Sequence, residues 1–211
     1  MFSSGKSVEI IIEEGRKHQT AGNLNKAYDC FVDALKREPE NTEAIFHIGV
    51  IQMMGGRFDT ALSFFDKLTE LQPEAERNWN NRAICLQKLG DMDGALESFD
   101  QALAINPNYF NAWFGKGDAW YSIAANREII PGPDGQPVIK PKTAEFVNAL
   151  KCYEEALRLN SNFPPALLGK AHCLFFLKRR SEARGIAEIL LRIDPNNKVA
   201  NALMNLVMFD F

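Results

Sequence analysis

Small and apolar residues recur along this chain in columns that lie 34 residues apart. The clearest column is made of alanines: Ala27, Ala61, Ala95, Ala149 and Ala183. The gap between Ala95 and Ala149 is 54 residues, which equals one repeat plus 20 inserted residues. Four residues after the first four alanines stands an aromatic residue: Phe31, Phe65, Phe99 and Tyr153. A fixed period of this size is typical of a solenoid, a stack of similar helical units.

Two more columns predict what each unit looks like. Twelve residues before each alanine stands a small residue: Gly15, Gly49, Ala83, Gly117 and Ala171. A small residue lets two helix backbones approach closely, and the aromatic column fills the space between helices. Twelve residues after each alanine stands a proline, or serine in the fourth unit: Pro39, Pro73, Pro107, Ser161 and Pro195. Proline cannot continue a helical hydrogen-bond ladder, so each unit is predicted to be a hairpin of two helices.

This pattern resembles the tetratricopeptide repeat (TPR) family. The segment 79–107, WNNRAICLQKLGDMDGALESFDQALAINP, carries the family's Trp, Ala, Phe and Pro columns at their spacing. The resemblance covers about residues 8–197. It implies one all-α domain over residues 1–211, a right-handed superhelix of about eleven helices with a concave face. The expected units are 8–41, 42–75, 76–109, 110–163 and 164–197, followed by a terminal helix at 198–211.

The 20 extra residues, 124–143, fall between the two helices of the fourth unit. Their four prolines and two glycines exclude a continuous helix. Short β-branched runs on both sides of an Asp-Gly turn predict a small hairpin or a compact loop, and Thr143 is expected to cap the helix that follows. An insertion this long is often functional, although loop length costs little stability and a neutral insertion is the alternative. The candidate contact residues are Ile129, Ile130, Asp134, Val138 and Ile139.

Composition argues against several classes of function. The formal net charge is −3 with mixed signs, which gives no nucleic-acid footprint. No apolar run reaches membrane-spanning length, and the first 15 residues lack the features of a secretion signal, so we expect a cytoplasmic protein. The four cysteines show no C-x2-C spacing and are expected to be free core residues rather than metal ligands.

The sequence offers no convincing catalytic group. Ser4-Gly5-Lys6-Ser7 resembles the end of a phosphate-binding loop, but the required earlier glycine and strand are missing. The three histidines lie in different repeats, and no serine or cysteine is spaced to act with them. We therefore expect neither enzymatic activity nor a cofactor.

The resemblance implies that the first helix of each unit lines a peptide-binding groove. The middle of that groove is polar, and amides suit the backbone of an extended peptide. Its candidates are Arg77, Asn80, Asn81, Gln87, Lys88 and Asn111. The C-terminal part is largely apolar and suits the apolar face of a helix, unless its aromatics simply pack on neighbouring helices. Its candidates are Phe114, Tyr121, Leu168, His172 and Phe175.

Some relatives bind the C-termini of chaperones through a carboxylate clamp of Lys, Asn, Asn, Lys and Arg. The clamp register that starts at the first unit holds Ile12, Arg16, His47, Arg77 and Asn81. This match is poor and argues against chaperone-tail binding, although Arg16, His47 and Arg77 leave a basic trace of the clamp.

The terminal helix is apolar on more than one face, whereas the last helix of a solenoid should have a polar outer side. An apolar surface of this kind points to self-association or partner contact; a longer natural chain or an ordinary cap are the alternatives. The candidate surface residues are Leu203, Leu206, Phe209 and Phe211.

These observations favour a non-enzymatic protein-interaction scaffold that binds a peptide or protein segment in its groove, with a second contact through the insertion. Two alternatives stay open. The chain could be an assembly protein that self-associates through its terminal helix, or the substrate-recruiting part of a larger enzyme.

Overall fold

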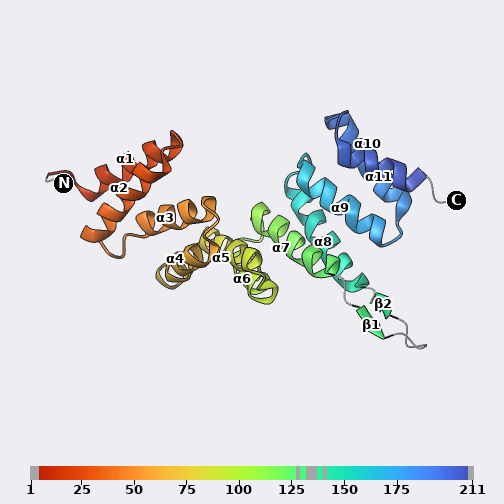
Figure 1. The fold of residues 1–211 in the computed structure, drawn as a ribbon, viewed down its shortest axis with the longest axis horizontal. Coiled ribbons are helices and arrows are strands. Elements are labelled where there is room, and N and C mark those ends of the chain that lie inside the picture. The colour runs from red at the N-terminus through yellow and green to blue at the C-terminus, as the bar shows by residue number, and fades with distance from the viewer. Residues whose placement is uncertain (1–4, 127–128, 132–136, 140–141, 209–211) are drawn as a thin grey trace. The chain divides into compact units, whose positions relative to one another are not determined.

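The computed structural model describes residues 5–126, 129–131, 137–139 and 142–208, and Figure 1 shows the elements they form. The chain divides into two units, residues 1–107 and 108–211, and each is described by itself. The expectation of one continuous TPR domain stays a prediction.

Unit 1 consists of three helical hairpins. Each first helix packs against the second helix that follows it. The six helices are α1 (Val8–Thr20), α2 (Leu24–Arg37), α3 (Thr42–Met54), α4 (Phe58–Leu71), α5 (Glu76–Leu89) and α6 (Met92–Ile105). The first helices begin 34 residues apart, at Val8, Thr42 and Glu76, as the alanine column predicts.

Unit 2 contains the insertion and the end of the chain. Its elements are α7 (Phe110–Ala125), β1 (Ile129–Pro131), β2 (Pro137–Ile139), α8 (Thr143–Leu159), α9 (Pro164–Phe176), α10 (Arg180–Ile193) and α11 (Lys198–Met208). The described parts of the two units thus hold eleven helices, and their one small sheet lies in the insertion. The predicted all-α class of stacked helical hairpins is confirmed.

A left-handed residue closes the turn inside four of the five hairpins. Gly22, Gly56 and Gly90 have φ angles of 76°, 73° and 91°, and Lys178 stands in the same column with φ 61°. The next residue donates its backbone N–H across the turn, as Asp91 does to the Leu86 carbonyl at 3.0 Å. This arrangement is a Schellman motif, which ends the first helix and favours glycine.

The fourth hairpin lacks this turn because its column holds Ala124, which is still helical. Helix α7 therefore continues to Ala125 and reaches 16 residues, and α8 has 17 residues, whereas the other hairpin helices have 13 or 14. The insertion begins where the tight turn would otherwise stand.

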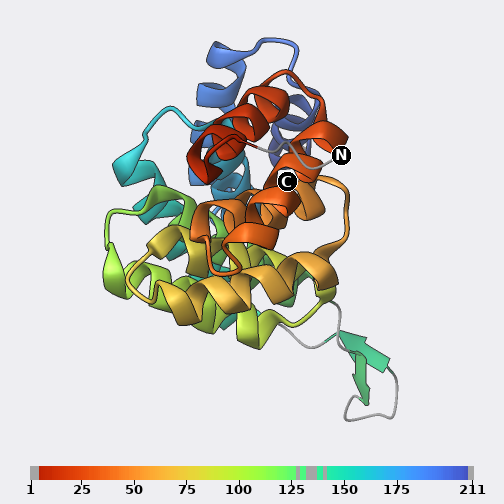
Figure 2. The same cartoon turned by 90° about the vertical axis from the view of Figure 1, so that its left-hand side faces the viewer.

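The insertion forms the predicted hairpin. Its strands run antiparallel, with Ile129 opposite Ile139, Ile130 opposite Val138 and Pro131 opposite Pro137. Figures 1 and 2 show these strands beyond the ends of α7 and α8.

The cap predicted for α8 is wrong. Lys142 occupies the N-cap position without a side-chain cap hydrogen bond, and Thr143 is the first helical residue. Lys142 instead donates from Nζ to the Ile123 carbonyl at 3.0 Å, which ties the start of α8 to the end of α7. A hydrogen bond from Lys142 to α7 is thus found at the position where a side-chain cap by the Thr143 hydroxyl was expected.

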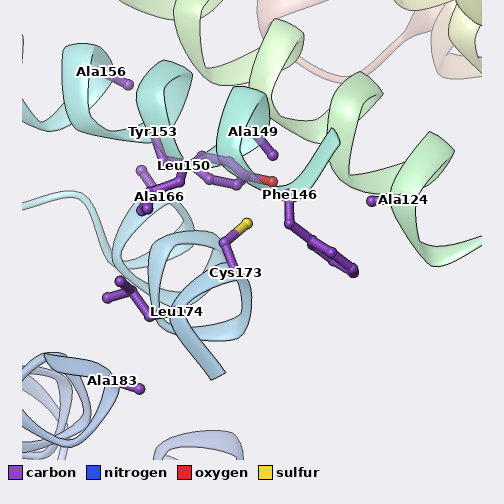
Figure 3. Packing of buried hydrophobic residues seen from close by; sticks show 10 residues of the cluster. All are labelled: Ala124, Phe146, Ala149, Leu150, Tyr153, Ala156, Ala166, Cys173, Leu174 and Ala183. Carbon is purple, nitrogen blue, oxygen red and sulfur yellow. The ribbon is translucent and has the colours of Figure 1, made fainter. Parts of the chain in front are cut away.

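The aromatic column forms the centre of the core. Phe31, Phe65 and Phe99 are completely buried. A Cβ atom added at Gly15 would lie 2.7 Å from Cε1 of Phe31, so the small column is what admits the ring. In unit 2 the ring of Tyr153 takes this place, and Cys173 of α9 points toward Tyr153 and Phe146 of α8 (Figure 3).

Candidate functional site

Three first helices of unit 1 present side chains that contact one another. Arg16 of α1 donates from Nη1 to Oε1 of Glu43 on α3 at 3.3 Å. The guanidinium carbon of Arg77 on α5 lies 4.5 Å from the ring centroid of Phe46. Nε2 of His47 lies 4.0 Å from the same Glu43 oxygen. We call this surface, made by Arg16, Glu43, Phe46, His47, Arg77 and Asn81, the first-helix face of unit 1.

His47 lies between this face and the core. Its ring stacks on Phe31 with centroids 4.7 Å apart and an interplanar angle of 6°. Burial lowers the pKa of His47, and the Glu43 carboxylate opposes this shift only in part. The imidazole is therefore neutral near pH 7, and its buried Nδ1 has no hydrogen-bond partner. Arg16, His47 and Arg77, the basic trace of a clamp, do lie on one surface, but the first of them is paired with Glu43.

The predicted polar residues of α5 differ in their accessibility. Arg77 and Lys88 are exposed, and Asn81 and Gln87 are half-buried. Asn80 is only 4% exposed, and its Oδ1 atom is buried without a hydrogen-bond partner. Asn80 thus belongs to the packed side of this surface. Asn111, the last polar candidate, is exposed on α7 of unit 2.

In unit 2 the first helices α7 and α9 meet through aromatic rings. Tyr121 and His172 stack with centroids 6.1 Å apart. Asp118, one turn before Tyr121, accepts a 2.7 Å hydrogen bond from the buried hydroxyl of Tyr153. We call the surface made by Phe114, Asp118, Tyr121, Leu168 and His172 the first-helix face of unit 2.

The aromatic residues of this face are half-buried and also pack on their neighbours. Phe114 contacts Phe163 with centroids 5.0 Å apart, and Tyr121 contacts Phe146 at 5.9 Å. Phe175 contacts Phe176, which is 52% exposed. These rings thus combine a packing role with partial exposure.

Sequence reasoning did not single out the Tyr153–Asp118 pair. The signal in the sequence was Tyr153, which stands in the column that holds phenylalanine in the first three hairpins. A buried tyrosine hydroxyl needs a hydrogen-bond partner. An acidic residue on the first helix of the same hairpin, such as Asp118, is a candidate for that partner.

Leu203 does not lie on the predicted C-terminal surface. It is 3% exposed and packs with Ala171 and Ala187, because α11 docks its apolar face on α9 and α10. Val199 of the same helix is 43% exposed. The side chain of Leu206 and residues Phe209 and Phe211 lie outside the part that the structure describes.

The strands of the insertion contain Ile129, Ile130, Val138 and Ile139, but their side chains are outside the described part, as is Asp134 altogether. Between α7 and α8 the structure therefore describes only the backbone of the strand residues, and a contact through the insertion stays a prediction.

All four cysteines are free. Burial raises the pKa of Cys85 and of Cys173 to about 12, which keeps both as unreactive thiols near neutral pH. Among the described residues, no three His, Cys, Asp or Glu side chains are grouped so that they could hold a metal ion. No helix in the same residues is long and apolar enough to cross a membrane.

Comparison with sequence models of known protein families identifies the family of this chain. Three models described as tetratricopeptide repeats match residues 12–76, 77–109 and 144–206, which together span most of the chain. The chain belongs to the tetratricopeptide repeat family. TPR domains in general mediate protein–protein interactions and bind protein or peptide partners, and most are scaffolds rather than enzymes.

Curated relatives of this TPR chain are much longer proteins. It is 26% identical over 208 residues to the human DnaJ homolog subfamily C member 7, covering 97% of the chain and 40% of that protein. It is 25% identical over 159 residues to the barley (Hordeum vulgare) protein named probable UDP-N-acetylglucosamine–peptide N-acetylglucosaminyltransferase SPINDLY, covering 72% of the chain and 15% of that protein. The chain therefore spans less than half the length of either relative.

Solved TPR structures share the fold. PilF of Pseudomonas aeruginosa superimposes with a TM-score of 0.76 at 17% identity, covering 95% of this chain and 82% of that one. YrrB, described as a TPR protein with an unusual peptide-binding site, superimposes with a TM-score of 0.69 at 15% identity, covering 92% and 90%.

Proposed function

We propose that this TPR chain is a non-enzymatic scaffold that binds a peptide or protein segment on the first-helix faces of its two units. The observation that carries the proposal is the continuous contact of side chains across α1, α3 and α5. Arg16, Glu43 and Arg77 are exposed there, and they join three successive hairpins into one surface. A ligand lying across the helices could contact all three at once.

The polarity of this surface suits a peptide backbone. The half-buried amide of Asn81 can both donate and accept hydrogen bonds, as a peptide N–H and C=O require. His47 and Asn80 each hold a buried polar atom without a partner, which is costly in a folded protein. A ligand that shifts these side chains could satisfy them and so gain affinity. The peptide-binding site named for YrrB supports the same use of the fold.

The hairpin β1–β2 is proposed as a second contact. In the described part its strands pair with each other, and their backbones make no extensive contact with any helix. An isolated two-stranded hairpin is marginally stable in water, so contact with a partner would stabilise it. We also place the protein in the cytoplasm, which the four free cysteines support.

A selected ligand would test the first contact. Random 12-residue peptides displayed on phage are selected against the full chain, and the enriched peptides are synthesised for binding measurements. Arg77→Ala and Asn81→Ala should each weaken binding about tenfold or more if they lie under the peptide. Glu97→Ala, on the exposed surface of second helix α6, is the matched control and should change affinity less than about twofold. Equal losses in all three variants, or none, would contradict the proposal.

The hairpin is tested separately with a variant in which a short Gly-Ser linker replaces residues 127–141. Weaker binding of a native partner by this variant, with an unchanged melting temperature, would assign the hairpin a binding role. Unchanged binding of that partner would assign it none.

One finding favours a second candidate function. The barley relative carries the name of a glycosyltransferase, and this chain spans 15% of it. The chain could accordingly recruit substrates for a larger enzyme. Self-association through α11 has less support, since Leu203 is buried within its own unit.

A further inference from the structure

The fourth hairpin uses a tyrosine where the hairpins of unit 1 use phenylalanine. Phe31, Phe65 and Phe99 fill this place with no exposed surface, and Tyr153 fills it with 2% exposed. Gly117 and Gly169 both face the Tyr153 ring, as a Cβ atom at either would lie within 3 Å of it. Three hairpins pack well with a phenyl ring, so packing alone does not require the hydroxyl of Tyr153.

The Tyr153 hydroxyl forms a hydrogen bond with one carboxylate, that of Asp118. Tyr153 Oη donates to Oδ1 of Asp118 at 2.7 Å. Burial, followed by the charge of Asp118, raises the pKa of Tyr153 far above its ordinary value. The phenol therefore keeps its proton and donates at every physiological pH. This hydrogen bond fixes the rotamer of Asp118 on the first-helix face of unit 2.

An acid at this repeat position occurs in this hairpin alone. The same position holds Arg16, Val50, Ile84 and His172 in the other four hairpins. Tyr153 and Asp118 thus both differ from the residues at their repeat positions in the hairpins of unit 1, and both lie in the fourth hairpin.

The neighbours of Asp118 along α7 are aromatic, and Asp118 itself is half-buried. Phe114 lies one turn before it and Tyr121 one turn after it, and all three are half-buried. Gly115, three residues before Asp118 on the same side of the helix, adds no side chain beside it. His172 stacks on Tyr121 from α9, and burial lowers its pKa, so it adds no positive charge near pH 7.

A carboxylate between aromatic rings is a receptor for a cation. A guanidinium can pair with both carboxylate oxygens and stack on a neighbouring ring, and an ammonium can do so as a point charge. Resting on the proposed peptide-binding function, we propose that Asp118 binds a cationic side chain of the protein partner, arginine in preference to lysine. Phe114 and Tyr121 flank this side chain, and Tyr153 is the positioning residue for Asp118.

The test selects phage-displayed random 12-residue peptides against the full chain in three forms: wild type, Asp118→Asn and Glu188→Gln. Glu188 is a partly exposed acid on second helix α10 and serves as the matched control. Peptides enriched by the wild type and by Glu188→Gln should share an arginine or lysine at one position, and Asp118→Asn should lose this preference.

A synthetic peptide then closes a double-mutant cycle. Replacing its conserved arginine with neutral citrulline should weaken binding to the wild type about tenfold and weaken binding to Asp118→Asn much less. Tyr153→Phe should reduce affinity and leave the preference for arginine in place, because it frees the rotamer of Asp118 and keeps its charge. Thermal melts show which variants are folded, and the citrulline comparison on the wild type holds even if one of them is not.

Four results would overturn the inference. Enriched peptides without a shared basic residue, or an unchanged preference in a folded Asp118→Asn, would overturn it and leave peptide binding intact. Equal binding of the arginine and citrulline peptides by the wild type would do the same. A library that enriches no peptide at all would contradict the proposed function as well.

Discussion

The ring of Phe65 occupies the space that a side chain at Gly49 would need. A Cβ atom built on Gly49 would lie 2.9 Å from Cζ of Phe65, which is closer than such atoms pack. Helices α3 and α4 can approach this closely only because residue 49 is glycine. The same relation joins Gly15 to Phe31, so one physical cause explains two columns of the repeat.

Gly49→Ala should therefore destabilise the protein by about 1–3 kcal/mol, since the completely buried Phe65 has no room to move. Gly185→Ala is the matched change in helix α10, where a Cβ would meet nothing within 4 Å. It should stabilise by up to about 1 kcal/mol, the difference in helix propensity. Urea unfolding of both variants measures these changes, and shifts of the same sign would refute this account of the column.

The sequence was sufficient for the hairpins and their order, because small and large residues alternate with a period that only paired helices explain. It was not sufficient for the length of α7. The sequence shows glycine at Gly22, Gly56 and Gly90, one in each hairpin of unit 1. Only the positive φ angles in the structure show that the turn at these positions needs a left-handed backbone. Ala124 in that column does not end the helix, and α7 runs on to Ala125.

Lys178 is the one non-glycine residue with positive φ in the described part of the chain. A side chain in this conformation costs about 1 kcal/mol relative to glycine. Lys178→Gly should consequently raise the free energy of unfolding by about that amount, and Gly56→Ala should lower it by a similar amount. Differential scanning calorimetry would show the two melting temperatures moving in opposite directions; a lower melting temperature for Lys178→Gly would argue against strain at this turn.

Single positions on a helix were harder to assign than whole faces. Asn80 and Asn81 are adjacent and chemically identical, yet Asn80 is buried and Asn81 is half-exposed. A helix turns by about 100° per residue, so only packing decides which neighbour faces inward. The apolar α11 posed the same problem: Leu203 faces the core and Val199 faces outward.

Leu203→Ala should cost about 2–4 kcal/mol, because it leaves a cavity against Ala171 and Ala187. Val199→Ala should cost less than about 0.5 kcal/mol, because its side chain is 43% exposed. Chemical denaturation followed by circular dichroism compares them. If the two variants were equally stable, the docking of α11 described above would be incorrect.

Stability should fall as the solution is acidified below about pH 6.5. Burial lowers the pKa of both His47 and His172, so the folded state keeps them neutral at a pH where the unfolded chain, with a histidine pKa of about 6.5, takes up protons. Stability is thus fully present above about pH 6.5 and is lost as the pH falls from there toward the lowered pKa values. Urea midpoints between pH 7.5 and 5.5 measure the slope. His47→Gln and His172→Gln should each flatten it, and slopes identical to wild type would exclude these histidines as its source.

Hydrogen–deuterium exchange of the full chain, with and without a selected peptide at saturation, tests the proposed binding surface most directly. The account predicts slower exchange in first helices, α1, α3 and α5 or α7 and α9, with little change in second helices α2, α4, α6 and α10. Slower exchange confined to the second helices, with the first helices unchanged, would contradict it.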